Sequence, residues 1–126
     1  MVLYCLSGFN AQATNYYTFI SGDWSNPGIW TQDPTGLTSV SPGIPGAADA
    51  AFIINNKSVT NTVTSRTVTS TFIQSNATLD LGSITGNNLG TVTGSGLIKI
   101  NSTSFPLGTF TAFVAATGGT VEYYDI

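Results

Sequence analysis

The chain repeats part of its own sequence at a short interval, and this internal repeat constrains the fold more than any other feature. The stretch FIINNKSVTN at 52–61 aligns with FIQSNATLDL at 72–81, with Phe opposite Phe and Ile53 opposite Ile73. Two later stretches, LIKINS and TVEYYDI, continue the pattern. The apolar anchors of the series are Ile53, Ile73, Ile98 and Val121, and the intervals between them are uneven.

Two further series of apolar residues accompany these anchors. One contains Val59, Leu79, Leu81, Phe105 and Leu107; the other contains Val63 or Val68, Val92, and Phe110 or Phe113. Three short strands in each uneven period are typical of the stacked coils of a parallel β-helix, in which like residues lie above one another. The sequence therefore predicts an all-β chain that forms a right-handed parallel β-helix. A β-sandwich built from hairpins is the alternative, although the chain has no Asn-Gly or Asp-Gly pair for a tight hairpin turn.

Alternation within the short stretches agrees with a β-helix, because successive side chains of a strand point to opposite faces. Asp80, Lys99 and Glu122 each lie between two apolar residues and are expected to point outward. The residues expected to point inward in these stretches are Leu79, Leu81, Ile98, Ile100, Val121 and Tyr123.

Both tryptophans of the chain lie in the segment SGDWSNPGIW, just before the first coil. The first coil of a solenoid has an apolar end with nothing beneath it, and terminal coils need a cap. We therefore expect Trp24 and Trp30 to form a structural cap against residues 52–54. The alternative is that they stack on sugar rings together with Tyr16 and Tyr17.

Three asparagines occupy the same place after successive anchor isoleucines. Asn56, Asn76 and Asn101 are therefore expected at one recurring corner of the coil, because Asn tolerates a positive φ better than any residue except Gly. If these corners stack, each side-chain amide can donate a hydrogen bond to the next, and the three form a corner ladder.

Residues 1–13, MVLYCLSGFNAQA, resemble a secretory signal peptide without its basic start. A short apolar run precedes the A-x-A cleavage site Ala11-Gln12-Ala13, so we predict a mature chain that begins near Thr14. The alternative is an N-terminal strand with a chance A-x-A. The run is far too short to cross a membrane, and Cys5, the only cysteine, would be removed with it.

Composition divides the rest of the chain at residue 50. Residues 14–49 begin with an aromatic stretch and continue as a loop rich in Pro and Gly, so they are predicted to form the N-terminal cap and its loop. Residues 50–126 are predicted to form the β-helix coils. The sequence stops at GGTVEYYDI, which reads as the middle of a coil, so the coils are expected to continue in a longer protein.

Charged residues are scarce and histidine is absent, which excludes several classes of function. Lys57, Arg66 and Lys99 are the only cations, against six carboxylates. Binding to nucleic acid or to an anionic membrane needs clusters of Lys or Arg, so neither partner is expected. Without histidine, a Ser-His nucleophile or a zinc site of the usual kind is excluded.

No catalytic, cofactor or metal site is predicted from the remaining residues. Asp80 is alone on its strand, Glu122 falls in a different series of strands, and Lys99 has no acidic neighbour in the sequence. A glycoside hydrolase would need two carboxylates close together. Asp23, Asp33 and Asp49 lie in the loops before the first coil and could bind calcium. Turn caps are the more common role of such residues, and the sequence leaves calcium binding open.

The order of several motifs resembles the N-terminal part of large Bacteroidetes surface proteins, and the gliding-motility adhesins of the SprB type are the most similar. These motifs are SGDWSNPGIW, GIPGAADAAFII, SVT, ATLDLG, GTVTGSGLIKI and GTFTAFVAATGGTVEYY. The Trp-containing segment is also similar to the G8 domain. The residues that match its layout are Trp24, Trp30, Pro45, Gly46, Asp49 and Ile53 or Ile54, although two alanines separate Gly46 from Asp49.

The resemblance implies an exported protein of the bacterial cell surface. Such proteins leave the cell through the Sec system and the type IX secretion machinery, and they act in adhesion or gliding. We therefore expect a non-enzymatic, structural and adhesive part of a large secreted protein, whose target includes surface polysaccharide as one option. Two alternatives are a carbohydrate-binding module, with an exposed row of aromatic residues, and a fragment of a polysaccharide-active β-helix enzyme, with two acids in a cleft.

Overall fold

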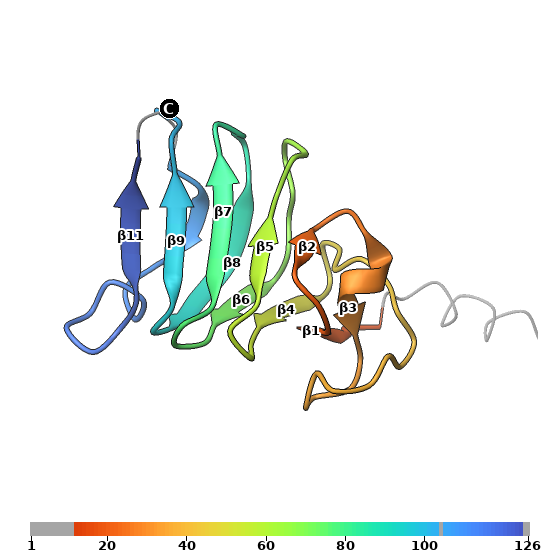
Figure 1. Cartoon of the computed structure of the whole chain (residues 1–126). Coiled ribbons are helices and arrows are strands. Elements are labelled where there is room, and N and C mark those ends of the chain that lie inside the picture. Colours follow the sequence, from red (N-terminus) through yellow and green to blue (C-terminus); the bar gives the residue numbers. More distant parts are fainter. Residues whose placement is uncertain (1–11, 104, 125–126) are drawn as a thin grey trace, which may run out of the picture.

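Short β-strands make up almost all of the regular structure, and the computed structural model describes residues 12–103 and 105–124 (Figure 1). The strands are β1 (Asn15–Thr18), β2 (Gly22–Asp23), β3 (Trp30–Thr31), β4 (Ala50–Ile53), β5 (Ser58–Thr60), β6 (Ser70–Ile73), β7 (Thr78–Gly82), β8 (Asn88–Gly94), β9 (Leu97–Ile100), β10 (Leu107–Thr109) and β11 (Thr120–Tyr123). The only helical element of the described residues is one short 3-10 turn, η1 (Pro27–Ile29).

The strands stack in two sheets. Sheet A has six strands in the order β10-β8-β6-β4-β1-β3, and sheet B has five in the order β11-β9-β7-β5-β2. Every named pairing is parallel except that of β1 with β3. Parallel pairing between successive coils is the arrangement of a β-helix, so this prediction is confirmed and the β-sandwich alternative is wrong.

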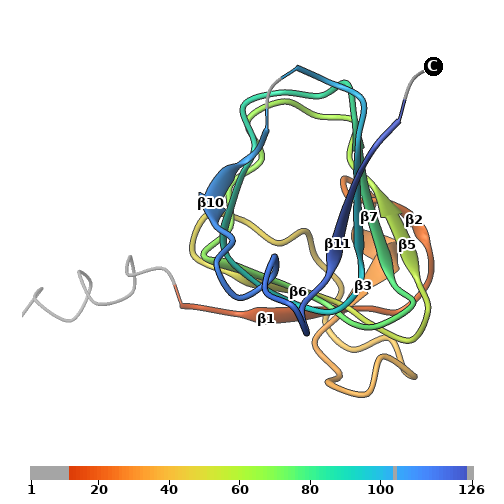
Figure 2. The same cartoon turned by 90° about the vertical axis from the view of Figure 1, so that its left-hand side faces the viewer.

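The coils wind in a right-handed sense. Figure 2 looks along the axis from the C-terminal end, with β5, β7 and β11 on one side and β10 on the other. The chain runs anticlockwise in this view as it approaches the viewer. Right-handed crossovers are nearly universal between parallel strands, because a right-twisted strand packs back onto its sheet only in that way.

The internal repeat of the sequence corresponds to one coil. Ile53 of β4 lies beside Ile73 of β6, and Val59 of β5 lies beside Leu79 of β7. All four side chains are fully buried. The apolar positions of the repeat therefore stack inside the solenoid, as the sequence predicts.

The third coil does not follow this spacing, and here the predicted register is wrong. Ile98 lies beside Leu79 in sheet B, whereas the sequence alignment places it with Ile53 and Ile73 in sheet A. The alignment places 25 residues between Ile73 and Ile98, whereas the coil spans 21 residues in sheet A, from Ile73 to Gly94, and 19 in sheet B, from Leu79 to Ile98. Four residues connect the sheets in the first two coils (54–57 and 74–77), but only residues 95–96 do so in the third.

The C-terminal strands differ from the sequence prediction in a second way. Phe105 and Leu107, expected to pack beside Leu79, are 40% and 63% exposed, and β10 belongs to sheet A. Tyr123, expected to point inward, is 63% exposed, because β11 is the last strand of sheet B and no described strand covers it. Val63 is exposed as well, whereas Val68 is buried.

The first strands of both sheets come from residues before position 50. β1 pairs with β4 in sheet A, and β2 pairs with β5 in sheet B. The stacked strands therefore extend into the segment predicted as cap and loop. The antiparallel strand β3 covers the outer edge of β1, and the Pro/Gly-rich loop follows it.

Candidate functional site

The outer face of sheet B brings three charged side chains into one row. Asp80 of β7 lies beside Lys99 of β9, and Lys99 lies beside Glu122 of β11. The sequence prediction that Asp80 and Glu122 belong to different series of strands is therefore wrong, and Lys99, which has no acidic neighbour in the sequence, has one on each neighbouring strand. We call Asp80, Lys99, Glu122 and the adjacent Tyr124 the charged row.

Specific contacts connect the charged row. Lys99 Nζ lies 3.8 Å from Glu122 Oε1 and 4.7 Å from the centre of the Tyr124 ring. The Tyr124 hydroxyl donates to Asp80 Oδ1 at 2.9 Å, and the backbone N–H of Gly82 donates to the same oxygen. Each charged group of the row thus has a hydrogen-bond or ion-pair partner within the row.

This arrangement differs from that of a retaining glycosidase, whose two carboxylates lie about 5–5.5 Å apart. The hydrogen bond to Asp80 raises the pKa of the Tyr124 phenol, with smaller contributions from burial and from Glu122. Tyr124 therefore stays protonated and cannot act as a base near neutral pH. Asp80 and Glu122 are two strands apart, roughly 9–10 Å by the spacing of strands, and Lys99 lies between them.

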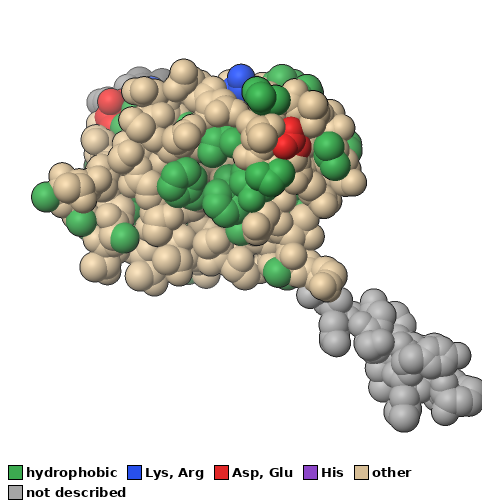
Figure 3. All heavy atoms as spheres, turned by 90° about the horizontal axis from the view of Figure 1, so that it is seen from below, with side chains coloured by type: hydrophobic (Ala, Val, Ile, Leu, Met, Phe, Trp, Pro, Cys, Tyr) green, Lys and Arg blue, Asp and Glu red, His purple; other side chains and the backbone are tan. Residues whose placement is uncertain are grey.

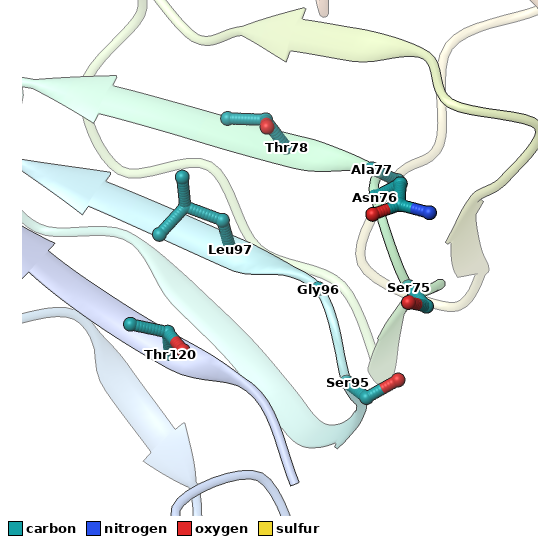
Figure 4. A pocket seen from close by; sticks show the side chains of 8 residues that line it. All are labelled: Ser75, Asn76, Ala77, Thr78, Ser95, Gly96, Leu97 and Thr120. Atoms are coloured by element: carbon teal, nitrogen blue, oxygen red, sulfur yellow. The ribbon is translucent and has the colours of Figure 1, made fainter.

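A hollow lies next to this row, at the corner where the third coil is short. It is an open depression of about 330 Å³, lined by Ser75, Asn76, Ala77, Thr78, Ser95, Gly96, Leu97 and Thr120 (Figure 4). We call it the short-corner groove. Thr78, Leu97 and Thr120 begin three successive strands of sheet B and lie beside one another in register. The groove therefore opens on the same face as the charged row.

A second hollow of about 400 Å³ lies between residues 45–47 and residues 63–67, and Arg66 lines it. The Arg66 guanidinium donates from Nη2 to Ser25 Oγ at 2.7 Å and lies 5.7 Å from the centre of the Trp24 ring. Burial lowers the pKa of Arg66, and the negative charge of Asp23 opposes this shift. The guanidinium is thus already held by side chains of the N-terminal segment.

The two tryptophans lie at the N-terminal end of the solenoid, and both indoles are fully buried. Their rings make an edge contact with centres 5.1 Å apart, and Trp30 Nε1 donates to the Trp24 carbonyl at 2.9 Å. The backbone N–H of Trp24 donates to the Thr60 carbonyl at the end of β5. Buried rings offer no face to a sugar, so this geometry favours the cap over sugar stacking.

The three asparagines of the expected ladder do not share one corner. Asn56 and Asn76 occupy equivalent positions and both have positive φ, at 59° and 67°. Asn101 follows β9 at the far end of sheet B, a consequence of the register shift of the third coil. At the Asn56 corner another hydrogen bond joins the two coils: the backbone N–H of Asn55 donates to Gln74 Oε1 at 2.6 Å.

A buried pair of asparagine amides does occur, but at a corner that the repeat of the sequence does not predict. Asn61 Nδ2 donates to Asn87 Oδ1 at 3.0 Å, and the same oxygen accepts the backbone N–H of Arg66. Both asparagines are almost fully buried. They do not occupy equivalent positions of the repeat, so the spacing of the sequence could not reveal them.

The three aspartates of the N-terminal segment each cap a separate turn. Asp23 accepts from the Ser25 N–H and the Thr62 hydroxyl, and Asp49 accepts from the backbone N–H of Thr14 and Gly46. Asp33 accepts from the backbone and side chains of residues 35 and 38, and these bonds hold its pKa well below the usual range. Among the described residues, no three potential ligands are grouped as a metal ion would require.

An aromatic row lies on the outer face of sheet A. The rings of Tyr17 and Phe52 stack with centres 4.7 Å apart, and Phe52 and Phe72 follow at 5.9 Å. Figure 3 shows hydrophobic side chains gathered on one face of the molecule. These distances are close to the spacing of strands, so the rings stand side by side on neighbouring strands, and all three side chains are partly exposed. The planes of Phe52 and Phe72 are inclined to each other by 44°, so the row is not a single flat platform.

Comparison with protein-family models, with curated proteins and with solved structures gave no match to this chain. A search of the described residues for a helix long and apolar enough to cross a membrane also found none.

Proposed function

We propose that this chain is a non-enzymatic, structural and adhesive part of a large secreted protein that acts at the bacterial cell surface. The observation that carries the proposal is the stack of coils, whose outer faces carry mainly Thr, Ser and Asn and few charges. Its charged row consists of paired side chains instead of free acids and bases. A rigid solenoid with few charged residues suits a spacer or an adhesive stalk better than a catalytic centre.

The proposed route of export is the Sec system, with cleavage after Ala13, followed by the type IX secretion machinery. This part of the proposal rests on the A-x-A motif and on the resemblance of residues 14–126 to SprB-type adhesins and the G8 domain. The cleavage site borders the undescribed residues 1–11, so the test is chemical: N-terminal sequencing of secreted protein should begin at Thr14. An exported protein that retains Met1 would contradict the signal peptide.

Surface exposure and adhesion are tested in the native cells. An antibody against residues 14–126 should label intact cells, and external protease should remove the label. Cells that lack the gene should attach to surfaces or glide less well than the parent strain, and the cloned gene should restore the behaviour. Label that appears only after the cells are broken open would contradict the proposed location.

A carbohydrate-binding module is the second candidate, and the short-corner groove is the observation that favours it. An enzyme is the third, because Asp80 and Glu122 share one face. We expect no turnover of polysaccharides, since Lys99 lies between these acids and neither lines the groove. Reproducible turnover that is lost in Glu122→Gln would contradict this expectation.

A further inference from the structure

We propose that the short-corner groove binds a neutral polyhydroxylated ligand, a short segment of an uncharged polysaccharide. This inference deepens the proposed adhesive function, because it names the chemical class that the surface would hold. It rests on three properties of the groove: its permanent shape, its unpaired polar side chains and its lack of charge.

The shape follows from the short corner of the third coil. With only Ser95 and Gly96 between β8 and β9, the chain is recessed relative to the four-residue corner of the coil before it. Gly96 is packed tightly, and a Cβ on it would overlap both the Gln74 carbonyl oxygen and Ile73 Cγ2. The recess is therefore built into the backbone and does not depend on a mobile side chain.

Five polar side chains surround this recess without any hydrogen-bond partner among the described residues. They are Ser75, Asn76, Thr78, Ser95 and Thr120. Hydroxyl groups both donate and accept, and an amide offers two donors and an acceptor. A ligand with many hydroxyl groups is the natural complement of such a set.

The groove also has an apolar contact and no charge. Leu97 lies between Thr78 and Thr120 and offers a surface for the C–H groups of a sugar ring. None of the eight lining residues is charged. The closest charged side chains on the same strands belong to the charged row, and Lys99 and Glu122 are paired with each other. The lining itself therefore offers no cation to an anionic polymer, and Lys57, whose carbonyl accepts the backbone N–H of Thr78, is not among the lining residues.

The size of the groove sets a limit on the affinity. Its volume of about 330 Å³ is at the lower end of the range of small-molecule sites, roughly 300–1,000 Å³. It holds only a short part of a polymer, so a single site binds weakly. Many copies of the protein on one cell surface would together bind the polymer more tightly than a single copy, through avidity.

The test is affinity electrophoresis of the isolated protein in native gels that contain dextran, mannan or laminarin, with alginate as the anionic polymer. The net charge of −3 carries the protein towards the anode. We expect at least one neutral polymer to slow its migration. The variant Asn76→Gly/Thr78→Val/Thr120→Val should bind that polymer at least tenfold more weakly, because each neutral hydrogen bond contributes about fivefold to affinity.

The substitutions are chosen to leave the fold and the charge unchanged. Asn76 has a φ of 67°, which Gly adopts without strain, and Val keeps the β-branched shape of Thr on a strand. Thr60→Val on β5 makes the same exchange on the same sheet outside the groove, and it should bind like the parent protein. Circular dichroism and thermal unfolding check that each variant is folded.

Three outcomes would overturn the inference: no neutral polymer slows the protein, the triple variant is slowed as much as the parent, or only alginate slows it. The proposed adhesive function is tested separately in cells. Adhesion without polysaccharide binding would reject the groove alone, whereas binding without surface exposure would reject the adhesive function alone.

Discussion

At the scale of single residues, the two tryptophans occupy the position where the solenoid most needs apolar volume. Trp24 follows the first strand of sheet B, and Trp30 begins the strand that covers the edge of sheet A. Their rings contact each other and exclude water from the interior at this end. A buried aromatic side chain of this kind removes roughly 150–250 Å² from water.

Replacing Trp30 by Ala should therefore lower the free energy of unfolding by about 3–5 kcal/mol, the usual cost of truncating a buried aromatic residue. Urea denaturation followed by circular dichroism measures this change. Leu37→Ala is the control, because Leu37 is 73% exposed and should cost little. Equal stability of Trp30→Ala and the parent protein would show that the cap does not stabilise the coils.

A second residue-scale prediction concerns Gly96. Its Cβ would overlap the backbone of Gln74 and the side chain of Ile73, so Gly96→Ala should destabilise the protein by about 1–3 kcal/mol, as overpacking does. Gly46→Ala is the matched control, since a Cβ there lies 3.6 Å from its nearest neighbour. Thermal unfolding of both variants measures this difference in stability. Similar melting temperatures would contradict the expected overlap of a Cβ at position 96 with its neighbours.

At the scale of elements, sheet B connects its last three strands through side chains as well as through backbone hydrogen bonds. Asp80 on β7 binds Tyr124 just after β11, and Lys99 on β9 lies against the Tyr124 ring. Because these contacts join strands far apart in the sequence, they attach the last strand to the stack.

The bond between Tyr124 and Asp80 predicts a pH dependence. The folded state raises the pKa of Tyr124, so this group stabilises the fold at pH values below the unfolded pKa of about 10. The stabilisation is lost as the pH rises through the higher folded value. The difference in free energy of unfolding between the parent protein and Tyr124→Phe should therefore shrink as the pH increases above about 10.

Denaturation curves at a series of alkaline pH values measure this difference. Tyr123→Phe provides the comparison, since Tyr123 is 63% exposed and its hydroxyl has no hydrogen-bond partner among the described residues. A Tyr124→Phe curve that runs parallel to that of the parent protein at every pH would show that the bond to Asp80 does not form in solution.

At the scale of the whole molecule, the two ends of the solenoid differ. The N-terminal end is covered by β3, which is short and fully buried, as protected edges usually are. At the other end, β10 and β11 are edge strands, and Leu107, Val114 and Tyr123 near them are at least 60% exposed. Unpaired strand edges with apolar side chains favour association with another chain.

We therefore expect this chain, prepared by itself, to associate through its C-terminal end in a concentration-dependent way. Sedimentation velocity should show less association for Leu107→Lys/Tyr123→Lys than for the parent protein, because charged side chains on an edge oppose pairing. Leu37→Lys, in the loop at the other end, should leave the association unchanged. An equal effect of both variants would mean that the apolar surface as a whole drives the association.

Much of the fold could be predicted from the sequence because its signals are local. Alternation around Asp80, Lys99 and Glu122 identified three strands with their outward faces, and the repeat of 52–61 at 72–81 identified the first two coils in correct register. Both signals follow from the pleat of a strand and from the stacking of like residues, so neither needs knowledge of distant contacts.

The register of the third coil, and with it the candidate site, was decided only by the tertiary structure. A corner of two residues around Gly96 replaces one of four, and the sequence does not say which spacing a Gly-rich stretch will adopt, because glycine is compatible with both. The stacking of the third coil on the second places Ile98 beside Leu79 and Lys99 between Asp80 and Glu122, and the short corner opens the groove beside Leu97. The residues of each strand can be identified from the local sequence. Which strands lie beside one another depends on how the connecting corners pack in space.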